Sequence, residues 1–498
     1  MSDSEEELTI VSNRLPVVLN RCGTDWQVDP GTGGLVQAMN PILTENGGCW
    51  VGWPGVTKEE GTGWKPGLEQ VSADSGYELE HVVLTQEQLE GFYEGYANSV
   101  VWPLFHGFPD RCEFRPQFYR AYGEVNDRFA EVIAARMGRG GFVWIHDYHL
   151  FEAARRLRQK GFRGRTAFFL HIPFPSVENF SKLPWREELL SDLLHYDLVG
   201  FQTRRDLHHF ETCVEGLGLA TAEKREQGLR RFDLGARVVE AGAFPIGIDY
   251  EDFARRARSE TVTQRVEELR GDLGDCQVVL GVDRLDYSKG LLHRLRAYEQ
   301  TLERHPELCE EVVLFQLVVP SRENVAEYQA LKEEFDREVG RINGRFSTAG
   351  WQPIHYRYNR VGPQELSAMY RMASVGLVTP LRDGMNLVSK EYCASQVDED
   401  GVLVLSEFAG AAEQLERGAI VVNPYDISQT AQALYRAITM PGDERRQRMR
   451  RIRQVVAESD VYHWAESFLT RARLREETVQ RVVGSEVDKF AMPERRGL

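Results

Sequence analysis

The stretch GLVTPLRDGMNLVSKEYCASQ, residues 376–396, decides the fold class because a strand passes directly into a helix within it. Residues 375–379 form a short apolar run with a β-branched bias, which is typical of a buried strand. After the next few residues, the apolar side chains recur at helical spacing. Arg382, Asp383 and Gly384, which lie between, are not residues that a protein core would contain. The stretch therefore predicts a strand, a polar loop and a helix in immediate succession.

The same strand-then-helix unit recurs along the whole chain. In the first half, strands are predicted at 8–12, 142–145, 167–170 and 197–201. In the second half, they are predicted at 278–282, 312–318, 353–356, 375–379, 402–405 and 420–422, with helices at 290–304, 322–340, 364–373, 385–396, 409–416 and 427–439. This alternation indicates an α/β fold with parallel sheets covered by helices on both faces. In such sheets, ligands bind outside the carboxyl ends of the strands.

The length of the chain, 498 residues, is too great for one core, so two domains are expected. The alternation breaks at 241–249, where glycines and a proline interrupt it. We therefore predict an N-terminal domain at 1–243 and a C-terminal domain at 244–455, which face each other across a cleft. A long helical stretch at 444–473 ends the chain's folded part. Its last portion, 456–475, is expected to pack back toward the N-terminal domain, followed by a tail at 476–498.

The composition argues against several classes of protein. The net charge is −16, from 60 basic and 76 acidic residues, which argues against nucleic acid or a membrane surface as the main partner. The seven cysteines are scattered without CxxC spacing, so we expect reduced thiols and no zinc site. Neither a signal-peptide pattern nor an apolar run long enough to span a bilayer is present. We therefore expect a soluble, cytoplasmic protein.

Polar residues and glycines follow several of the predicted strands at their carboxyl ends. In chain order they are His146, Asp147, Tyr148, His149, His171, Arg284, Asp286, Lys289, Arg322, Arg382, Asp383, Gly384, Ser406, Glu407 and Gly410. A single aspartate at such a place is more often a helix cap, and a single histidine is usually satisfied by backbone groups. Five or six strands from two domains that all end in this way are harder to explain by structural roles. Together they predict a cleft for a phosphorylated, hydroxyl-rich ligand.

The basic residues of one loop suit a diphosphate. Lys289 precedes a glycine at a helix start, where a compact ammonium suits a phosphate oxygen, although a solvated loop charge is the alternative. Arg284, five residues earlier, would reach the same group. Gly33 and Gly34 open another helix, whose N–H groups favour an anion or a sugar oxygen.

The opening stretch supplies ligands for the sugars of the same molecule. Asp383 would accept hydrogen bonds from sugar hydroxyls, and Gly384 allows a close approach of the backbone. The N–H groups of residues 385–388 would point at the diphosphate. Glu391, about two turns further on, would bind a ribose diol. The stretch therefore predicts a loop and a helix that hold a nucleotide sugar at both ends.

Several other chemistries lack their sequence signals. The chain has no GxGxxG fingerprint and no GxxxxGK[ST] loop, so dehydrogenases and P-loop enzymes are not indicated. It has no HExxH spacing, and we interpret HDYH at 146–149 as a group of hydrogen-bonding residues. We therefore predict no metal and no cofactor, with a nucleotide sugar as co-substrate.

A series of long motifs occurs in the order seen in the trehalose-6-phosphate synthases, glycosyltransferase family 20. They are VSNRLPV, GGL, WPLFH, WIHDYHL, FFLHIPFPS, DLVGFQT, FPIGID, RLDYSKGL, PSR, GRINGRF, LVTPLRDGMNLVSKEY and VLVLSEFAGAAEQL. The chain resembles this family from about residue 8 to 470. The resemblance implies the GT-B fold, with a Rossmann-like domain for the acceptor facing a second one for the nucleotide sugar. It also implies a retaining, metal-independent hexosyltransferase that moves glucose from a nucleotide sugar, UDP-glucose being favoured, to glucose 6-phosphate. The product would be α,α-trehalose 6-phosphate.

The resemblance also assigns site residues, motif by motif. For the acceptor it implies Arg14, Tyr93, Trp102, Asp147 and Arg322, with the two arginines on the phosphate of glucose 6-phosphate. For the donor it implies Gly33, Gly34, His171, Arg284, Lys289, Val361, Asp383, Gly384, Met385, Asn386, Leu387, Val388, Ser389, Lys390 and Glu391. Among these, the residues expected to be catalytic are Asp147, His171, Arg284, Lys289 and Asp383.

The implied mechanism uses one face of the sugar. Retaining enzymes often have a carboxylate nucleophile, but no carboxylate of this sequence is evidently placed as one. In the family, the leaving phosphate is thought to help deprotonate the incoming hydroxyl. Arg284 and Lys289 would then stabilise the charge that develops on the diphosphate. The segment between SNRLPV and GGL is longer than in the shortest members and predicts a hairpin over the acceptor pocket.

Other interpretations stay open at this point. A related enzyme uses glycerol 3-phosphate and makes glucosylglycerol phosphate, whereas a non-catalytic protein would only sense sugar phosphates. A pyridoxal-phosphate-dependent phosphorylase would need a Schiff-base lysine. The sequence does not distinguish UDP, ADP and GDP in the donor, nor a monomer from a homo-oligomer. It lacks a phosphatase motif after residue 470, so we expect a separate trehalose-phosphate phosphatase downstream.

Overall fold

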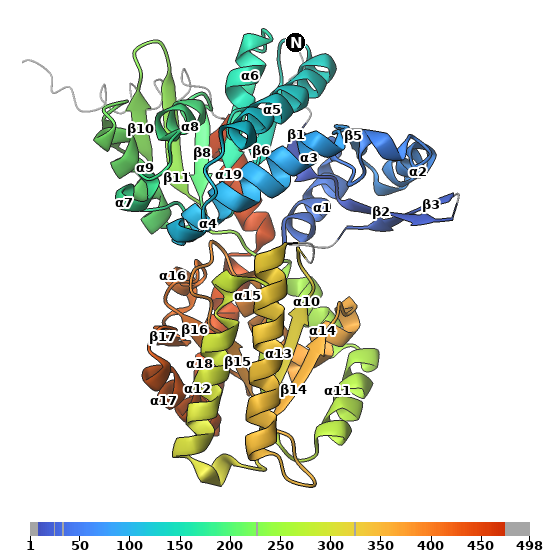
Figure 1. The fold of residues 1–498 in the computed structure, drawn as a ribbon, viewed down its shortest axis with the longest axis vertical. Coiled ribbons are helices and arrows are strands. Elements are labelled where there is room, and N and C mark those ends of the chain that lie inside the picture. The colour runs from blue at the N-terminus through green and yellow to red at the C-terminus, as the bar shows by residue number, and fades with distance from the viewer. Residues whose placement is uncertain (1–7, 24, 32–33, 226–227, 323–324, 474–498) are drawn as a thin grey trace, which may run out of the picture.

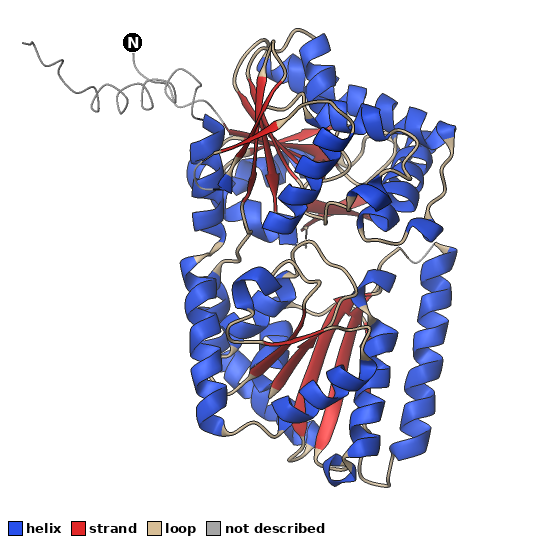
Figure 2. Ribbon diagram, turned by 90° about the vertical axis from the view of Figure 1, so that its left-hand side faces the viewer, coloured by secondary structure: helices blue, strands red, loops and turns tan. Residues whose placement is uncertain are grey.

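The computed structural model describes residues 8–23, 25–31, 34–225, 228–322 and 325–473. These residues form two lobes stacked along the long axis of the molecule, each built on one large sheet (Figure 1). The N-terminal half of the chain makes the first lobe, and the second lobe begins at helix α10. Helices cover both faces of the sheets (Figure 2), so the predicted α/β class with two parallel sheets is confirmed.

The sheet of the first lobe has nine strands in the order β5-β4-β1-β6-β7-β8-β11-β10-β9. Their bounds are Glu78–His81, Cys49–Trp53, Leu8–Arg14, Phe142–His146, Arg165–Phe169, Leu198–Phe201, Val238–Ala243, Arg230–Asp233 and Ala222–Lys224. The first seven strands in this order are parallel, and the last two pair antiparallel at one edge. The four strands predicted for this half are present, and five of the nine were not predicted. Strands such as CWVGW (β4) are short and rich in tryptophan and glycine, so they lack the β-branched pattern of a buried strand.

The helices of the first lobe and a hairpin complete it. The helices are α1 Gly34–Asn46, α2 Lys65–Ser75, α3 Gln86–Leu89, the π-type helix Glu90–Val101, α4 Trp102–Phe105, α5 Pro116–Met137, α6 Ala153–Gln159, α7 Val177–Phe180, α8 Arg186–Leu193 and α9 Arg204–Gly216, with short 3-10 turns at Lys58–Glu60 and Pro109–Arg111. The hairpin consists of β2 Val17–Cys22 and β3 Asp25–Pro30. The hairpin therefore forms as predicted, but β3 packs along α2, where Val28 would meet any side chain placed at Gly67.

The sheet of the second lobe has six parallel strands in the order β14-β13-β12-β15-β16-β17. Their bounds are Ile354–Tyr358, Val312–Val319, Gln277–Arg284, Val375–Val378, Val402–Ser406 and Ile420–Val422. The helices are α10 Tyr250–Arg258, α11 Glu260–Leu273, α12 Leu291–Arg304, α13 Ala326–Phe346, α14 Pro363–Met372, α15 Leu387–Ser395, α16 Ala412–Leu415, α17 Ile427–Ile438 and α18 Gly442–Glu458, with 3-10 turns at Tyr287–Lys289 and Pro306–Leu308. All six strands predicted for this half are present, because each is a short apolar run between clear turn residues.

The end of the chain returns to the first lobe. The predicted helical stretch 444–473 is two helices, because Asp460 caps a new helix by accepting a hydrogen bond from the N–H of His463 (2.8 Å). That helix, α19 Val461–Arg473, packs against β7, β8 and α1. The domain limits at 243 and 455 themselves remain predictions.

The two segments that cross between the lobes touch each other. A Cβ on Gly247 would lie 2.2 Å from the carbonyl carbon of Asp460, so only glycine fits there. In addition, the N–H of Val461 donates to the carbonyl of Ile248 (3.1 Å). The two crossings therefore form one compact connection.

One apolar cluster continues from the second lobe into the first. Trp144 of β6 stacks on Phe468 of α19, with ring centres 4.6 Å apart, and lies 5.1 Å from Trp464. This cluster covers one face of the first sheet, and a second cluster covers the other face. The last helix therefore holds the carboxyl end of β6 against apolar side chains of the second half of the chain.

Candidate functional site

The loops that follow the strands of the two sheets meet at the boundary between the lobes. A Cβ on Gly384, after β15, would lie 2.2 Å from the carbonyl oxygen of His171, after β7. The next residue, Met385, places its sulfur 3.2 Å from Nδ1 of His171. The structure therefore brings strand-end residues from both lobes into direct contact.

Two arginines of the second lobe lie over an indole of the first. The guanidinium carbon of Arg322 is 4.5 Å from the ring centre of Trp102, and that of Arg284 is 5.8 Å away. Arg322 has a positive φ of 51° and also hydrogen-bonds the hydroxyl of Tyr328, with Asp286 3.7 Å away. Among the described residues, no carboxylate forms an ion pair with Arg284. Arg284 is therefore a cation that is available to an anionic ligand.

A second available cation lies at the end of β1 in the first lobe. The guanidinium of Arg14 lies over the ring of Trp53 at 4.6 Å, and in the described part of the chain it has no carboxylate partner. Tyr93 lies 6.4 Å from Trp53 and stacks on His149 at 5.8 Å. Aromatic rings that surround an unpaired arginine form a wall suited to a sugar phosphate.

Asp147 comes directly after β6 and is followed by Tyr148 and His149, whose rings are in contact. Its φ of 73° is unusual for an aspartate, and its Oδ1 accepts a hydrogen bond from the N–H of His171 (3.3 Å). Burial raises the pKa of Asp147 to about 7, although hydrogen bonds from backbone N–H groups and the charge of Arg284 oppose the shift. A carboxyl with such a pKa accepts or donates hydrogen bonds according to its ligand.

An ion pair marks the start of α15. Nζ of Lys289 lies 2.6 Å from Oδ2 of Asp383, and both side chains are nearly buried. Burial opposes ionisation of Asp383, but the charge of Lys289 and a hydrogen bond from Asn386 (3.0 Å) outweigh it, so the pKa of Asp383 lies below its ordinary value. Asn386 also caps α15 by accepting from the N–H of Ser389 (3.0 Å). The first N–H groups of α15 and Lys289 are thus held together at one point.

Two predicted donor ligands in α15 have structural partners for their side chains. Nζ of Lys390 donates to the carbonyl of Ile246 and to Oε1 of Gln414, both at 2.6 Å, and burial lowers its pKa to about 7. Glu391 accepts from the hydroxyl of Tyr370 (2.8 Å), and burial raises its pKa. The ammonium of Lys390 is therefore bound to the interlobe connection and not directed at the Lys289 ion pair. Sequence spacing could not show this, because it does not say which way a buried lysine points.

The other predicted donor residues are distributed as follows. Gly33 lies outside the described residues, and Gly34 begins α1 next to the side chain of Leu387, 2.8 Å from where its Cβ would be. Val361 lies in the loop between β14 and α14 and is partly exposed. Val388 and Ser389 belong to the first turn of α15, and Ser389 is fully buried.

Two further histidines lie near these residues: His146, which the sequence analysis placed at a strand end without a role of its own, and His106, which it did not single out. His146, at the end of β6, lies 3.1 Å from Nε2 of His171 through its Nδ1. His106 hydrogen-bonds the carbonyl of Trp102 (2.8 Å), and burial lowers its pKa to about 4. Both belong to motifs that the sequence analysis quoted, WIHDYHL and WPLFH. Their contacts with His171 and Trp102 depend on the tertiary structure, which the motifs alone do not reveal.

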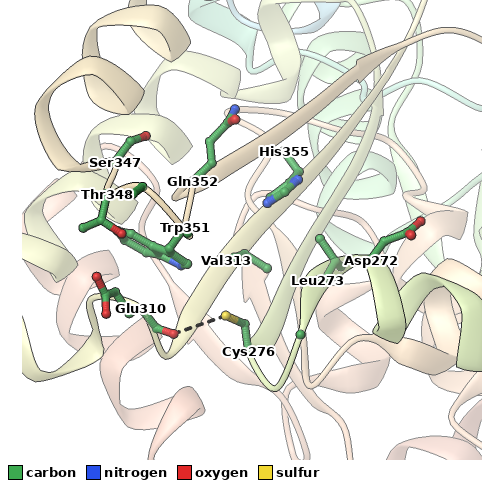
Figure 3. A pocket seen from close by; sticks show the side chains of 13 residues that line it. Asp272, Leu273, Cys276, Glu310, Val313, Ser347, Thr348, Trp351, Gln352 and His355 are labelled. Atoms are coloured by element: carbon green, nitrogen blue, oxygen red, sulfur yellow. Dashed lines mark hydrogen bonds between the residues drawn. The ribbon is translucent and has the colours of Figure 1, made fainter.

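The described residues also line hollows of different size. One of about 290 Å³ lies between α1 and α10 and is lined by Gly34, Leu387 and Arg256 among others, so it adjoins the start of α15. A larger one of about 830 Å³ (Figure 3) is lined by Cys276, Val313 and residues around Trp351. Cys276 precedes β12 and Val313 is the second residue of β13, so this larger hollow lies at the amino edge of the second sheet, away from the site.

No helix in the described ranges is long and apolar enough to cross a membrane. No group of three or more histidines, cysteines, aspartates and glutamates is arranged there to hold a metal ion.

The chain is similar to proteins of one family over nearly all of its length. The model of Glycosyltransferase family 20 matches residues 6–473. A trehalose-6-phosphate synthase of Mycolicibacterium smegmatis is 41% identical over 471 residues, which cover 93% of this chain and 92% of that protein. A bifunctional trehalose-6-phosphate synthase/phosphatase of Thermoproteus tenax is 42% identical over 475 residues, 93% of this chain. The chain spans only 63% of the length of that bifunctional protein.

Solved structures extend the comparison to the fold. An alpha,alpha-trehalose-phosphate synthase (UDP-forming) of Burkholderia xenovorans, in complex with glucose-6-phosphate, superposes with a TM-score of 0.85 at 35% identity. The match covers 94% of this chain and 100% of that one. The Escherichia coli protein bound with UDP-2-fluoro glucose superposes with a TM-score of 0.84, also at 35% identity, over 94% and 99% of the two chains.

Proposed function

The chain belongs to glycosyltransferase family 20, and we propose that it makes trehalose 6-phosphate by moving glucose from UDP-glucose to glucose 6-phosphate with retention. The observation that carries the proposal is that two unpaired arginines from different lobes flank one row of aromatic rings. Arg284 lies over Trp102 and acts on Asp147. Arg14 lies over Trp53 at the other end of the row, which runs through Tyr93, His149 and Tyr148 to Trp102. Each substrate carries a phosphate group, and each lobe supplies one unpaired cation. The solved relatives named above hold glucose 6-phosphate and a UDP-glucose analogue.

The acceptor would bind on the side of the first lobe. Arg14 and Arg322 would hold its phosphate by charge-assisted hydrogen bonds, since both guanidinium groups lie against aromatic faces that fix their direction. Asp147 and Tyr93 would contact its hydroxyls. Trp102 would form the wall that separates the acceptor from the donor phosphates.

The donor would bind on the side of the second lobe. Arg284, Lys289 and the first N–H groups of α15 would hold the diphosphate, and Asp383 would accept from hydroxyls of the glucose. When the bond to the diphosphate breaks, negative charge grows on its oxygen. The cations stabilise this charge, an effect worth about 2.7–4 kcal/mol for one well-placed donor.

The ion pair bears on how retention is achieved. A carboxylate nucleophile must be free to approach the anomeric carbon, but Asp383 is bound by both Lys289 and Asn386. Asp147 is held by the N–H of His171, with a pKa of about 7. Neither is arranged as a nucleophile, so the leaving phosphate is the base that the arrangement favours for the incoming hydroxyl.

The test is a matrix of substrates. Pure protein is incubated with UDP-, ADP- and GDP-glucose, each with glucose 6-phosphate and with glycerol 3-phosphate, and the release of nucleoside diphosphate is measured. We expect the highest rate for UDP-glucose with glucose 6-phosphate, and a product that a trehalose-phosphate phosphatase converts to trehalose. A higher rate with glycerol 3-phosphate would refute the acceptor, and no release in any pairing would refute the enzymatic function.

A further inference from the structure

His146 directly precedes Asp147 of the site, and its side chain contacts His171. It ends β6 and is fully buried, and its Nδ1 is 3.1 Å from Nε2 of His171. The two rings are nearly parallel, at 26°, with centres 5.3 Å apart. On its other side, His171 presents Nδ1 to Met385, in the loop after β15. The two imidazoles and the thioether thus form a chain that leads from the core to the second lobe.

The outer end of this chain determines the position of one proton. The sulfur of Met385 lies 3.2 Å from Nδ1 of His171, and a thioether only accepts hydrogen bonds. The contact is therefore a hydrogen bond only if Nδ1 of His171 carries the proton. Nε2 of His171 is then unprotonated and accepts a hydrogen bond, so Nδ1 of His146 must be the donor.

The inner end of the chain leads to the same assignment. Nε2 of His146 is buried and has no hydrogen-bond partner among the described residues. Its ring lies 4.6 Å from that of Trp144 and 6.5 Å from that of Trp464, and indole nitrogens only donate. Because no acceptor group of these neighbours is available to an Nε2–H, the proton of His146 belongs on Nδ1, where His171 accepts it.

Both imidazoles are neutral, so each carries one ring proton. Burial lowers the pKa of His171 to about 3. Burial, followed by the proximity of His171, lowers the pKa of His146 well below its ordinary value. Two arrangements of these protons allow a hydrogen bond between the neutral rings. The contacts of Met385 and of Nε2 of His146 favour the same arrangement.

We infer that His146 is a positioning residue that keeps the proton of His171 on Nδ1, so that His171 donates a hydrogen bond toward the loop after β15. The inference rests on the proposed function, in which this loop holds the glucose of the donor. A sugar hydroxyl that takes the place of the Met385 sulfur would accept from Nδ1 of His171. With the opposite tautomer, Nδ1 would itself be an acceptor and could not donate this hydrogen bond.

The first measurement reads the proton position without any activity. In the wild-type protein labelled with ¹⁵N-histidine, the resonances of His171 are identified by their loss in His171→Gln. We expect a protonated shift for Nδ1 of His171 and an unprotonated shift for Nε2. In His146→Phe, which keeps a ring but has no donor, we expect this preference to weaken, because only the contact with Met385 then favours it.

The second measurement separates positioning from packing. His146→Asn places an amide N–H near the former Nδ1, and Trp464→Phe disturbs the same aromatic group while keeping both imidazoles. We expect kcat of His146→Phe to fall about ten-fold or more, the size typical of lost orienting partners. The KM for glucose 6-phosphate should stay within about two-fold, since a single neutral hydrogen bond that does not touch the acceptor is removed. His146→Asn should recover most of the rate, and Trp464→Phe should be close to wild type.

Several outcomes would overturn the inference. They are a proton on Nε2 of His171 in the wild type, a wild-type kcat in His146→Phe, or an equal loss in His146→Asn and Trp464→Phe. The spectroscopic result on the wild type decides the tautomer even if His146→Phe does not fold. It also stands apart from the proposed function, because a protein without transferase activity would still give the two histidine signals.

Discussion

Replacement of Gly384 by alanine is expected to separate the two loops that make the site. The added Cβ would lie 2.2 Å from the carbonyl oxygen of His171 and 2.7 Å from Cα of Ile172, which are backbone atoms and cannot rotate away. Ordinary contact begins at 3.4 Å, so the loops must move apart by about 1.2 Å. A displacement of about 1 Å costs roughly 100-fold in rate when it misaligns reacting groups. We therefore expect kcat of Gly384→Ala to fall by about two orders of magnitude.

The assay is steady-state release of UDP at saturating UDP-glucose and glucose 6-phosphate, with thermal unfolding measured on the same samples. Overpacking of this kind lowers stability by about 1–3 kcal/mol, so the variant should still be folded at 25 °C. Gly140→Ala is the matched control, because a Cβ at Gly140 would meet nothing within 4 Å. A kcat of Gly384→Ala within three-fold of the control would refute the reasoning.

Three further predictions concern charge. Arg14→Ala should raise the KM for glucose 6-phosphate about ten- to hundred-fold, the value of a charge-assisted hydrogen bond. Arg284→Ala should instead lower kcat about 100-fold. Equal effects on KM and kcat in both variants would contradict these assignments. Because the folded-state pKa of Asp147 is about 7 against an ordinary 3.8, its ionisation opposes folding above pH 7 and not below pH 4. Asp147→Asn should thus be more stable than wild type in urea at pH 8 but not at pH 4, although its KM for the acceptor should rise. The same stability difference at both pH values would show that Asp147 does not titrate between them. Burial lowers the pKa of Lys390 from 10.5 to about 7, so the unfolded chain binds the extra proton between these values and wild-type stability rises with pH across this window. Lys390→Met should lack that rise, and parallel stability curves for the two proteins from pH 7 to 10 would show that Lys390 is not the group responsible.

The second lobe could be predicted well from the sequence, and the first lobe less completely. Each of the six strands of the second sheet is a short apolar run bounded by turns, so local pattern is sufficient to find it. In the first sheet, β9, β10 and β5 are short and partly exposed, and the residues of β9 and β5 are mostly polar. These strands form because they add to an existing sheet, and local pattern does not report that.

The candidate site shows the same difference between local and tertiary information. The sequence predicts that Lys289 and Asp383 each follow a strand. It does not predict that these strands are neighbours or that the two side chains pair at 2.6 Å. Lys390 stays a predicted donor residue, but the sequence does not show that its ammonium binds the carbonyl of Ile246, because only the tertiary structure decides which acceptor a buried ammonium reaches. The tautomer of His171 depends on groups from β6 and the loop after β15, which lie far apart in the chain.

The touching crossings at Gly247 and Asp460 restrict how the molecule opens. Two crossing segments that touch in this way would act as a hinge axis, about which the lobes can rotate but past which they cannot slide. Points far from this axis must travel furthest, and α13 lies on the other side of the molecule from α19 (Figures 1 and 2). The exposed ion pair between Arg111 and Glu327, at 3.2 Å, joins the first lobe to the start of α13, so a rotation that separates the lobes on this side would break it. Fluorophores at these two residues would report the rotation directly.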